Sequence, residues 1–264
     1  MYKLLLLLPI FLLALPEIDI VIPCHKKDKK SLQYCLESVK KNIANVRSIY
    51  VVSKEKLSDE AQWIPESTYS FSIEEVAEKM YGTPDPTLPR VGWMYQQFLK
   101  LYAKDAIPDL KEQYLVIDAD VILLKPVSFF TEEGVPLYSL GREHHHPYFT
   151  HIKRIYKDLP LLYPELSGIC HHMVFEQDLV TSLIEEVEKR NGVPFIDIVI
   201  KNLDMRAPVL MAFSEYELYF NYVMHKKRGE MRTLKWAYIG DLGMIRKYQK
   251  YGFDFVCLPS WRPQ

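Results

Sequence analysis

The sequence predicts an α/β protein: an open, mostly parallel sheet flanked by helices, followed by a mixed C-terminal part. Short apolar runs alternate with longer segments of helical periodicity through the first half of the chain. Beyond Asp120 the runs become mixed in type and order. The 264 residues, of which 48% are hydrophobic, suffice for one large domain. No repeat or low-complexity linker divides residues 17–264, which we therefore expect to form a single domain.

Strand and helix signals alternate along the first half of the chain. The expected strands are residues 18–23, residues 49–53 and an apolar run from Tyr114, and the expected helices begin near Ser31 and cover residues 73–80 and 92–106. Strands joined by helices in this order predict parallel pairing.

The second half of the chain contains both strand-like and helix-like patterns, in no regular alternation. Strands are expected at residues 136–140 and 170–175, and an apolar stripe from Leu179 to Val187 predicts a helix. Residues 195–203 fit either period, and Pro194 at a first helical turn favours a helix.

Residues 1–16 form an apolar leader. The run from Leu4 to Leu15 is broken by Pro9 and is too short for a relaxed transmembrane helix. No small-x-small cleavage site follows it, and the first strand begins almost at once. We expect an uncleaved segment that associates with a membrane surface or is buried, with a cleaved signal peptide as the alternative.

Charge and cysteine usage exclude two classes. The formal net charge of −1 provides no global field for a polyanion, so no nucleic-acid partner is expected. The four cysteines lie far apart without CxxC spacing, which predicts reduced thiols instead of a disulfide framework or structural zinc.

Two carboxylates end the apolar run from Tyr114. Asp118 and Asp120 are separated by one alanine and should lie at the carboxyl edge of the sheet, where open α/β sheets bind ligands. Hard oxygen ligands suit Mg²⁺ or Mn²⁺ bridged to phosphates, whereas the simpler alternative is a solvated turn. The pair therefore predicts a metal–diphosphate site.

Four segments together point to a family. They are Val21-Ile22-Pro23, the helix Gly92–Leu101, Asp118-Ala119-Asp120 and Ser214–Tyr219. In this order they resemble the nucleotide-sugar glycosyltransferases of the GT-A (Rossmann-like) fold, from Asp19 to Met224. Within that fold the chain is similar to a poorly characterised bacterial and viral group that shares a Gln-Gln-x-x-Lys helix and a Ser-Glu-Tyr-Glu segment. The resemblance implies a GT-A-like sheet.

The resemblance also implies a metal site. Asp120 would bind Mn²⁺ or Mg²⁺ directly, with Asp118 on the ion, a water or the ribose hydroxyls, so that the diphosphate leaving group is neutralised. Such enzymes often add a downstream histidine, for which we choose His172 over His171 and His225. Neighbours on a strand point to opposite faces, so only one of the adjacent pair should reach the site.

Donor-binding residues are expected around the first strand. By resemblance, Pro23, His25 and Lys26 would hold the nucleotide diphosphate, Ser53 would lie near the base, and Lys100 would contact a phosphate or the donor sugar, together with Asp118. The simpler alternative is that these lysines are solvated surface residues without a ligand. The Glu-His-His-His tract at residues 143–146 is interpreted as an acceptor-side loop, because consecutive histidines cannot easily share one zinc ion.

The Ser214–Glu217 segment supplies the candidate catalytic base. Its spacing matches a capping box, which accounts for Ser214 and Glu217 structurally. Glu215 would sit in the first helical turn, ionised and able to take a proton from an acceptor hydroxyl. We therefore predict Glu215 as the base, with Glu217 second.

These residues predict a divalent-metal-dependent glycosyltransferase that moves a sugar from a nucleotide-diphosphate sugar, first of all a UDP-sugar, to an acceptor hydroxyl. A glycan, a lipid-linked or a protein acceptor is equally compatible. The alternatives are a non-catalytic carbohydrate-binding or membrane-associated scaffold and a sugar nucleotidyltransferase, although the latter would need a glycine-rich loop after the first strand. The expected location is the cytoplasm or a membrane facing the nucleotide-sugar pool, with the secretory pathway left open.

Overall fold

A five-stranded sheet in the order β3-β2-β1-β4-β7 forms the centre of the molecule. The computed structural model describes residues 16–141, 144–161, 165–204 and 213–259. The strands are β1 (Ile18–Pro23), β2 (Val46–Ser53), β3 (Gln62–Pro65), β4 (Gln113–Ile117) and β7 (His172–Glu176). The first four are parallel, and β7 runs antiparallel to β4. The predicted α/β class with a mostly parallel central sheet is confirmed.

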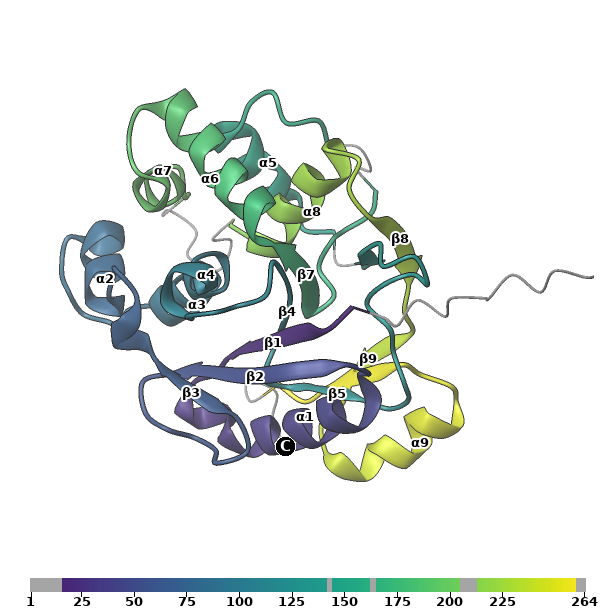
Figure 1. Cartoon of the computed structure of the whole chain (residues 1–264). Helices are drawn as coiled ribbons and strands as arrows, with labels where there is room; N and C mark the ends of the chain where they lie inside the picture. The colour runs from purple at the N-terminus through teal and green to yellow at the C-terminus, as the bar shows by residue number, and fades with distance from the viewer. Residues whose placement is uncertain (1–15, 142–143, 162–164, 205–212, 260–264) are drawn as a thin grey trace, which may run out of the picture.

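Helices cover both faces of this sheet (Figure 1). α1 (Lys29–Asn42) lies on the lower face in that view, and a larger group lies on the upper face. That group is α2 (Ile73–Tyr81), α3 (Val91–Leu101), α4 (Ala103–Ala106), α5 (His146–Ile155), α6 (Gln177–Asn191), α7 (Phe195–Lys201) and α8 (Glu215–His225). Strand side chains alternate accordingly: Val21 and Val116 join the core of the large group, whereas Ile20 and Leu115 pack with α1.

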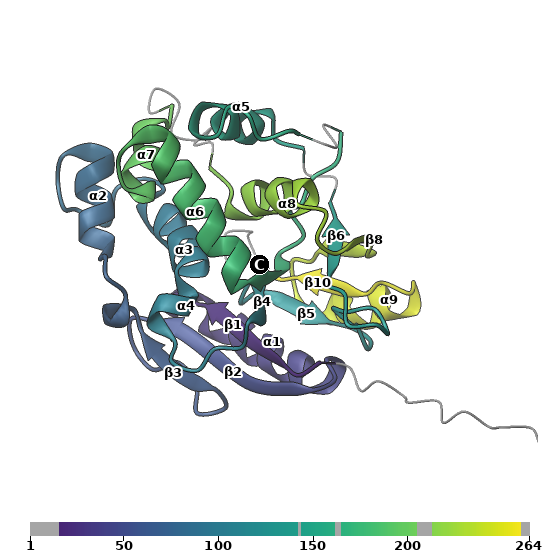
Figure 2. The ribbon, with the colours of Figure 1, turned by 45° about the horizontal axis from the view of Figure 1, so that its top comes forward.

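The chain leaves the central sheet immediately after β4. β5 (Val121–Leu123) belongs to a three-stranded sheet in the order β5-β10-β9, formed with β9 (Trp236–Tyr238) and β10 (Phe255–Cys257). Figure 2 shows β5 and β10 beside β4. β6 (Leu137–Leu140) and β8 (Glu230–Thr233) pair in parallel, and α9 (Ile245–Lys250) packs on the three-stranded sheet. This region is the predicted mixed part.

Several element boundaries differ from the predictions. The helix expected over residues 92–106 is two helices, because Tyr102 departs from helical geometry between α3 and α4. The basic loop after β1 contains a short 3₁₀ turn, Lys26–Asp28. The predicted helix over residues 195–203 is confirmed as α7. The elements β3, β8, β9, β10, α5 and α9 were not predicted, since most are short and only half buried and so carry little periodicity.

The leader prediction falls almost wholly on residues 1–15, which lie outside the described residues. Within the described part of the chain, no helix combines the length and the apolar character needed to cross a membrane.

Candidate active site

The Asp118-Ala119-Asp120 segment is a tight turn between the central sheet and the three-stranded sheet. β4 ends at Ile117 and β5 begins at Val121, whose N–H donates to the Asp118 carbonyl at 3.1 Å. Two distant segments fix the turn: the Asp118 N–H donates to the His171 carbonyl at 2.9 Å, and the Leu258 N–H donates to the Asp120 carbonyl at 2.8 Å. The acids therefore lie at the carboxyl edge of β4, as the sequence predicts.

Asp118 is fully engaged by protein groups. Its Oδ1 accepts from Lys100 Nζ at 2.7 Å and from the Tyr216 hydroxyl at 3.1 Å, and its Oδ2 lies 3.1 Å from His171 Nδ1. Burial disfavours the charged form, but the Lys100 ammonium and His171 outweigh it and hold the pKa of Asp118 well below its usual range.

Lys100 is buried between two carboxylates. Its Nζ lies 2.7 Å from Asp118 Oδ1 and 2.6 Å from Glu215 Oε1, and it sits 4.1 Å from the centre of the Tyr216 ring. Burial acts to lower the pKa of Lys100, yet the two carboxylates raise it overall. The α3 lysine predicted to face the site does so, and in this structure it links Asp118 to the base candidate on α8.

Asp120 differs from Asp118 in having an unsatisfied oxygen. Its Oδ1 is buried without a hydrogen-bond partner, which is uncommon for a carboxylate and requires an explanation. Burial and the neighbouring charge of Asp118 raise the pKa of Asp120 to about 6. A cation at this position would give Oδ1 a partner and would lower the pKa of Asp120.

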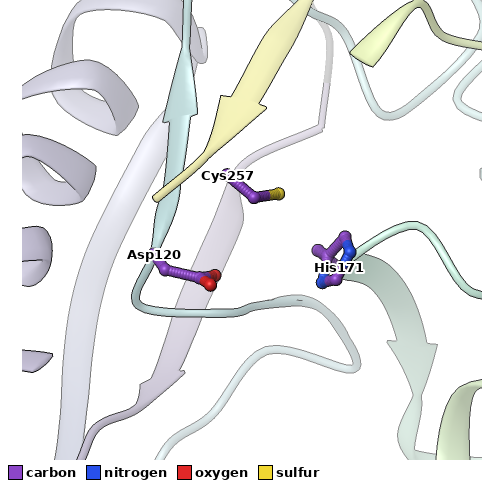
Figure 3. A group of neighbouring side chains, drawn as sticks. All are labelled: Asp120, His171 and Cys257. Atoms are coloured by element: carbon purple, nitrogen blue, oxygen red, sulfur yellow. The ribbon is translucent and has the colours of Figure 1, made fainter. Parts of the chain in front are cut away.

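His171 and Cys257 face the same point as Asp120 (Figure 3). One ligand atom from each of these three residues lies within 4.8 Å of the other two. His171 has φ of 59°, in the left-handed region that few non-glycine residues adopt, and it directly precedes β7. Its Nε2 lies 3.0 Å from the Tyr238 hydroxyl. The structure thus assembles one oxygen, one nitrogen and one sulfur donor.

His172, the histidine predicted as a metal ligand, does not belong to this group, and the structure places His171 beside Asp120 instead. The His172 ring is buried, with Nε2 3.0 Å from Ser139 Oγ and with edge contacts to Phe129 and Phe255. Burial lowers the pKa of His172 to about 3. The adjacent pair does diverge as expected, but β7 begins two residues later than predicted, and His171 precedes it in a left-handed conformation that turns its ring toward Asp120.

α8 presents Glu215 and Glu217 in different surroundings. The Glu215 N–H donates to Gln97 Oε1 at 3.1 Å, and its carboxylate forms the ion pair with Lys100. Ser214 caps the helix by accepting from the Glu217 N–H at 3.2 Å. The predicted reciprocal bond from Glu217 is replaced by others, from Ser167 Oγ at 2.7 Å and from Asn221 Nδ2 at 3.0 Å.

The Glu217 carboxylate therefore holds neighbouring segments of the chain together. Burial raises its pKa, and its bonds fix the 167–168 segment that leads to His171. Of the two predicted acids, Glu215 lies in the charged cluster and Glu217 lies behind it.

The predicted donor-binding loop follows β1 at the same edge of the sheet. The Pro23 carbonyl accepts from Gln96 Nε2 at 3.3 Å, and His25 caps the 3₁₀ turn by accepting from the Lys27 N–H at 3.2 Å. Lys26 is exposed and pairs with Glu55 at 2.8 Å. Ser53 is buried, and its hydroxyl donates to the Glu55 carbonyl at 2.8 Å.

Three contributors to the cluster were not predicted as site residues, Tyr216 on α8 among them, and the acceptor-side tract is only partly described. Tyr238 and Cys257 lie on β9 and β10, and no local motif marks them. All four cysteines are buried thiols, as expected. Glu143 lies outside the described residues, and His144 stacks on Phe149 with ring centres 4.4 Å apart.

The donors at Asp120 fit a divalent cation. The unsatisfied buried oxygen, the neighbouring imidazole and the thiol are all metal-ligating groups, and the carboxylate needs a positive partner. Because both oxygens of Asp118 already accept hydrogen bonds, Asp118 is better placed to orient His171 than to bind an ion directly.

The fold and site define an α/β protein with a buried, charged carboxylate cluster at the carboxyl edge of its sheet. The chain belongs to a family of unknown function, DUF6492, whose model matches residues 16–241. No curated protein matches the sequence. Among solved structures, the chain is similar to apo mouse xyloside xylosyltransferase 1, with 8% identity, a TM-score of 0.47, and coverage of 92% of this chain and 97% of that one.

Proposed function

We propose that the protein is a divalent-metal-dependent glycosyltransferase. It would transfer a sugar from a nucleotide-diphosphate sugar, with a UDP-sugar as the first candidate, to an acceptor hydroxyl. The observation that carries the proposal is the unsatisfied buried oxygen of Asp120 at the carboxyl edge of a parallel sheet. A bound ion is one of the few explanations for a buried carboxylate oxygen that has no partner within the protein.

Asp120 and His171 would hold the ion. When bound, a divalent ion offers charge neutralisation to a diphosphate leaving group, and the acids by themselves suit Mn²⁺ or Mg²⁺. Asp118 would keep the His171 ring oriented through the 3.1 Å contact. Asp118 is held in turn by Lys100 and Tyr216.

The loop after β1 would bind the nucleotide. Asp28 lies close enough to Asp120 to contribute to the rise in its pKa, so the 3₁₀ turn and the acid turn share one electrostatic environment. His25 and Lys26 are exposed on that loop, and Lys26 can exchange its surface partner Glu55 for a phosphate at little expense. Pro23 and Ser53 end the two strands beneath it.

Glu215 is the proposed base. Its Oε1 accepts from Lys100, so proton transfer from an acceptor hydroxyl would fall to Oε2. Lys100 then serves as a positioning residue that connects the base to Asp118. Glu217, with its carboxylate engaged by Ser167 and Asn221, supports the helix.

Thermal unfolding with a panel of nucleotides and nucleotide sugars tests the proposal. Each ligand is measured with a divalent ion and with chelator, and a ligand at 100 times its Kd should add about 2.7 kcal/mol to the free energy of unfolding. A metal-dependent shift with one nucleotide supports the proposal and identifies the donor. Stabilisation by oligosaccharides alone, without metal or nucleotide, would replace it with the carbohydrate-binding alternative.

A further inference from the structure

The three donors beside the acid turn include a sulfur atom, which the acids alone would not suggest. We propose that Cys257 is the third protein ligand of the metal site, with Asp120 and His171, and that this donor set favours Zn²⁺ or Co²⁺ over Mg²⁺. The inference rests on the metal site of the proposed function and specifies which ion that site takes.

Three separate elements bring these donors together. Asp120 ends the turn before β5, His171 precedes β7, and Cys257 is the last residue of β10. Cys257 pairs with Val121 across the β5–β10 ladder, and the next residue, Leu258, donates its N–H to the Asp120 carbonyl. The backbone thus fixes Cys257 directly beside Asp120.

The span of the site agrees with a single ion. Ligand atoms lie ~2.0–2.3 Å from zinc, so two ligands of one tetrahedral ion are roughly 3.3–3.8 Å apart. The three donor atoms already lie within 4.8 Å of one another. Small side-chain rotations therefore suffice for all three to reach one ion.

His171 is already oriented by its neighbours. One ring nitrogen contacts Asp118 Oδ2 at 3.1 Å and the other contacts the Tyr238 hydroxyl at 3.0 Å. An ion bound through either nitrogen replaces one of these contacts and leaves the other to hold the ring, which is the usual second contact of a metal-bound histidine.

The chemistry of the donors decides the metal preference. Carboxylate and water suit Mg²⁺ and Mn²⁺, whereas thiolate and imidazole suit Zn²⁺ and its spectroscopic substitute Co²⁺. Three protein ligands also leave a position for water or substrate, as in catalytic zinc sites. Binding would release the thiol proton of Cys257 to solvent, because only the thiolate is a ligand.

Cobalt titration of the full chain, stripped of metal with chelator, tests the inference directly. Co²⁺ bound by a thiolate gives a near-ultraviolet sulfur-to-cobalt charge-transfer band, which carboxylate and imidazole do not. We expect this band to appear and to saturate at one Co²⁺ per chain. Stoichiometric Zn²⁺ should abolish it, whereas Mg²⁺ in large excess should not.

Two variants locate the sulfur. Cys257→Ser should remove the band and weaken Zn²⁺ binding at least about tenfold. Cys170→Ser is the matched control, since Cys170 is also buried but lies outside the donor group, and this variant should keep the band. Circular dichroism shows whether each variant folds.

The wild-type spectrum alone can overturn the inference, even if Cys257→Ser does not fold. Absence of the band in wild-type protein, or its persistence in Cys257→Ser, excludes Cys257 as a ligand. A metal-dependent nucleotide shift without the band would leave the transferase standing and refute only the sulfur ligand. The band without any nucleotide shift would support the sulfur ligand and count against the nucleotide-sugar transferase.

Discussion

Two aspartates at opposite ends of the sheet have opposite surroundings. Asp19, near the start of β1, is fully buried and satisfied: Arg47 Nε donates to Oδ1 at 2.8 Å, Arg47 Nη2 also donates to Oδ2, and the Lys111 N–H donates to Oδ2 at 2.9 Å. Asp120, beyond the carboxyl end of β4, keeps one buried oxygen without a partner.

The comparison separates a carboxylate that holds the fold from one that is available to a ligand. A bidentate arginine and a backbone N–H satisfy Asp19 entirely within the chain. Asp120 sits beside another acid, and burial together with Asp118 raises its pKa to about 6. Mutations at the two ends should therefore affect different measurements.

The largest effect is expected at the acid turn. Asp120→Ala removes the proposed ligand, and loss of several kcal/mol of charge stabilisation should reduce transfer at least about a thousandfold. Because Asp120 lacks a partner for one oxygen, the unfolding midpoint should change little. Sugar transfer and chemical denaturation are measured on the same preparation, and an equal loss of folding would make the acid turn structural.

At the opposite end, Arg47→Ala should affect stability alone. It leaves the Asp19 carboxylate buried with only the Lys111 N–H, which should cost about 3 kcal/mol in the free energy of unfolding. Urea denaturation measures this loss, and metal affinity of the folded variant should match wild type. A change in metal affinity would mean that the two ends are coupled.

The adjacent histidines sharpen the assignment of the metal site. His171→Ala should weaken binding of a divalent ion by more than the about 10–100-fold typical of losing an outer-shell partner, because the ring faces Asp120 as a proposed direct ligand. His172→Asn should leave the affinity unchanged, since that ring lies against Phe129 and Phe255. Isothermal titration calorimetry on both variants compares them, and the reverse order of effects would restore His172 as the ligand.

The smallest effect concerns Glu186, a partly exposed carboxylate with partners within the chain. Tyr222, Lys226 and Tyr156 donate to it, and although burial opposes ionisation, these bonds lower its pKa to about 2 from 4.5. Its contribution should be full above about pH 4.5 and decline as the pH falls toward 2, about 1 kcal/mol after solvent screening. Stability measured against pH should fall in both proteins, because other carboxylates also titrate there, but by about 1 kcal/mol less in Glu186→Gln than in wild type.

The sequence predicts those parts of the site that depend on local pattern. Asp118 and Asp120 follow a buried apolar run, so their position at the sheet edge was predictable. Lys100 was predictable as a polar group on a helix that otherwise packs in the core. In each case, residues within a few positions carried the signal.

The remaining site residues depend on contacts that local pattern does not encode. His171 takes a left-handed backbone conformation just before β7, so strand alternation did not show that this histidine, and not His172, lies beside Asp120. Cys257 reaches the acid turn only through the pairing of β10 with β5. Glu217 meets the capping-box spacing, yet Ser167 and Asn221 take up its carboxylate.

The β5–β10 ladder has a consequence for synthesis of the protein. The paired residues Leu123 and Phe255 are roughly 130 residues apart, so β5 emerges from the ribosome long before its partner exists. Until then β5, which follows Asp120, has no β10 to pair with. The donor group of Asp120, His171 and Cys257 therefore cannot assemble until residues 255–257 have been synthesised.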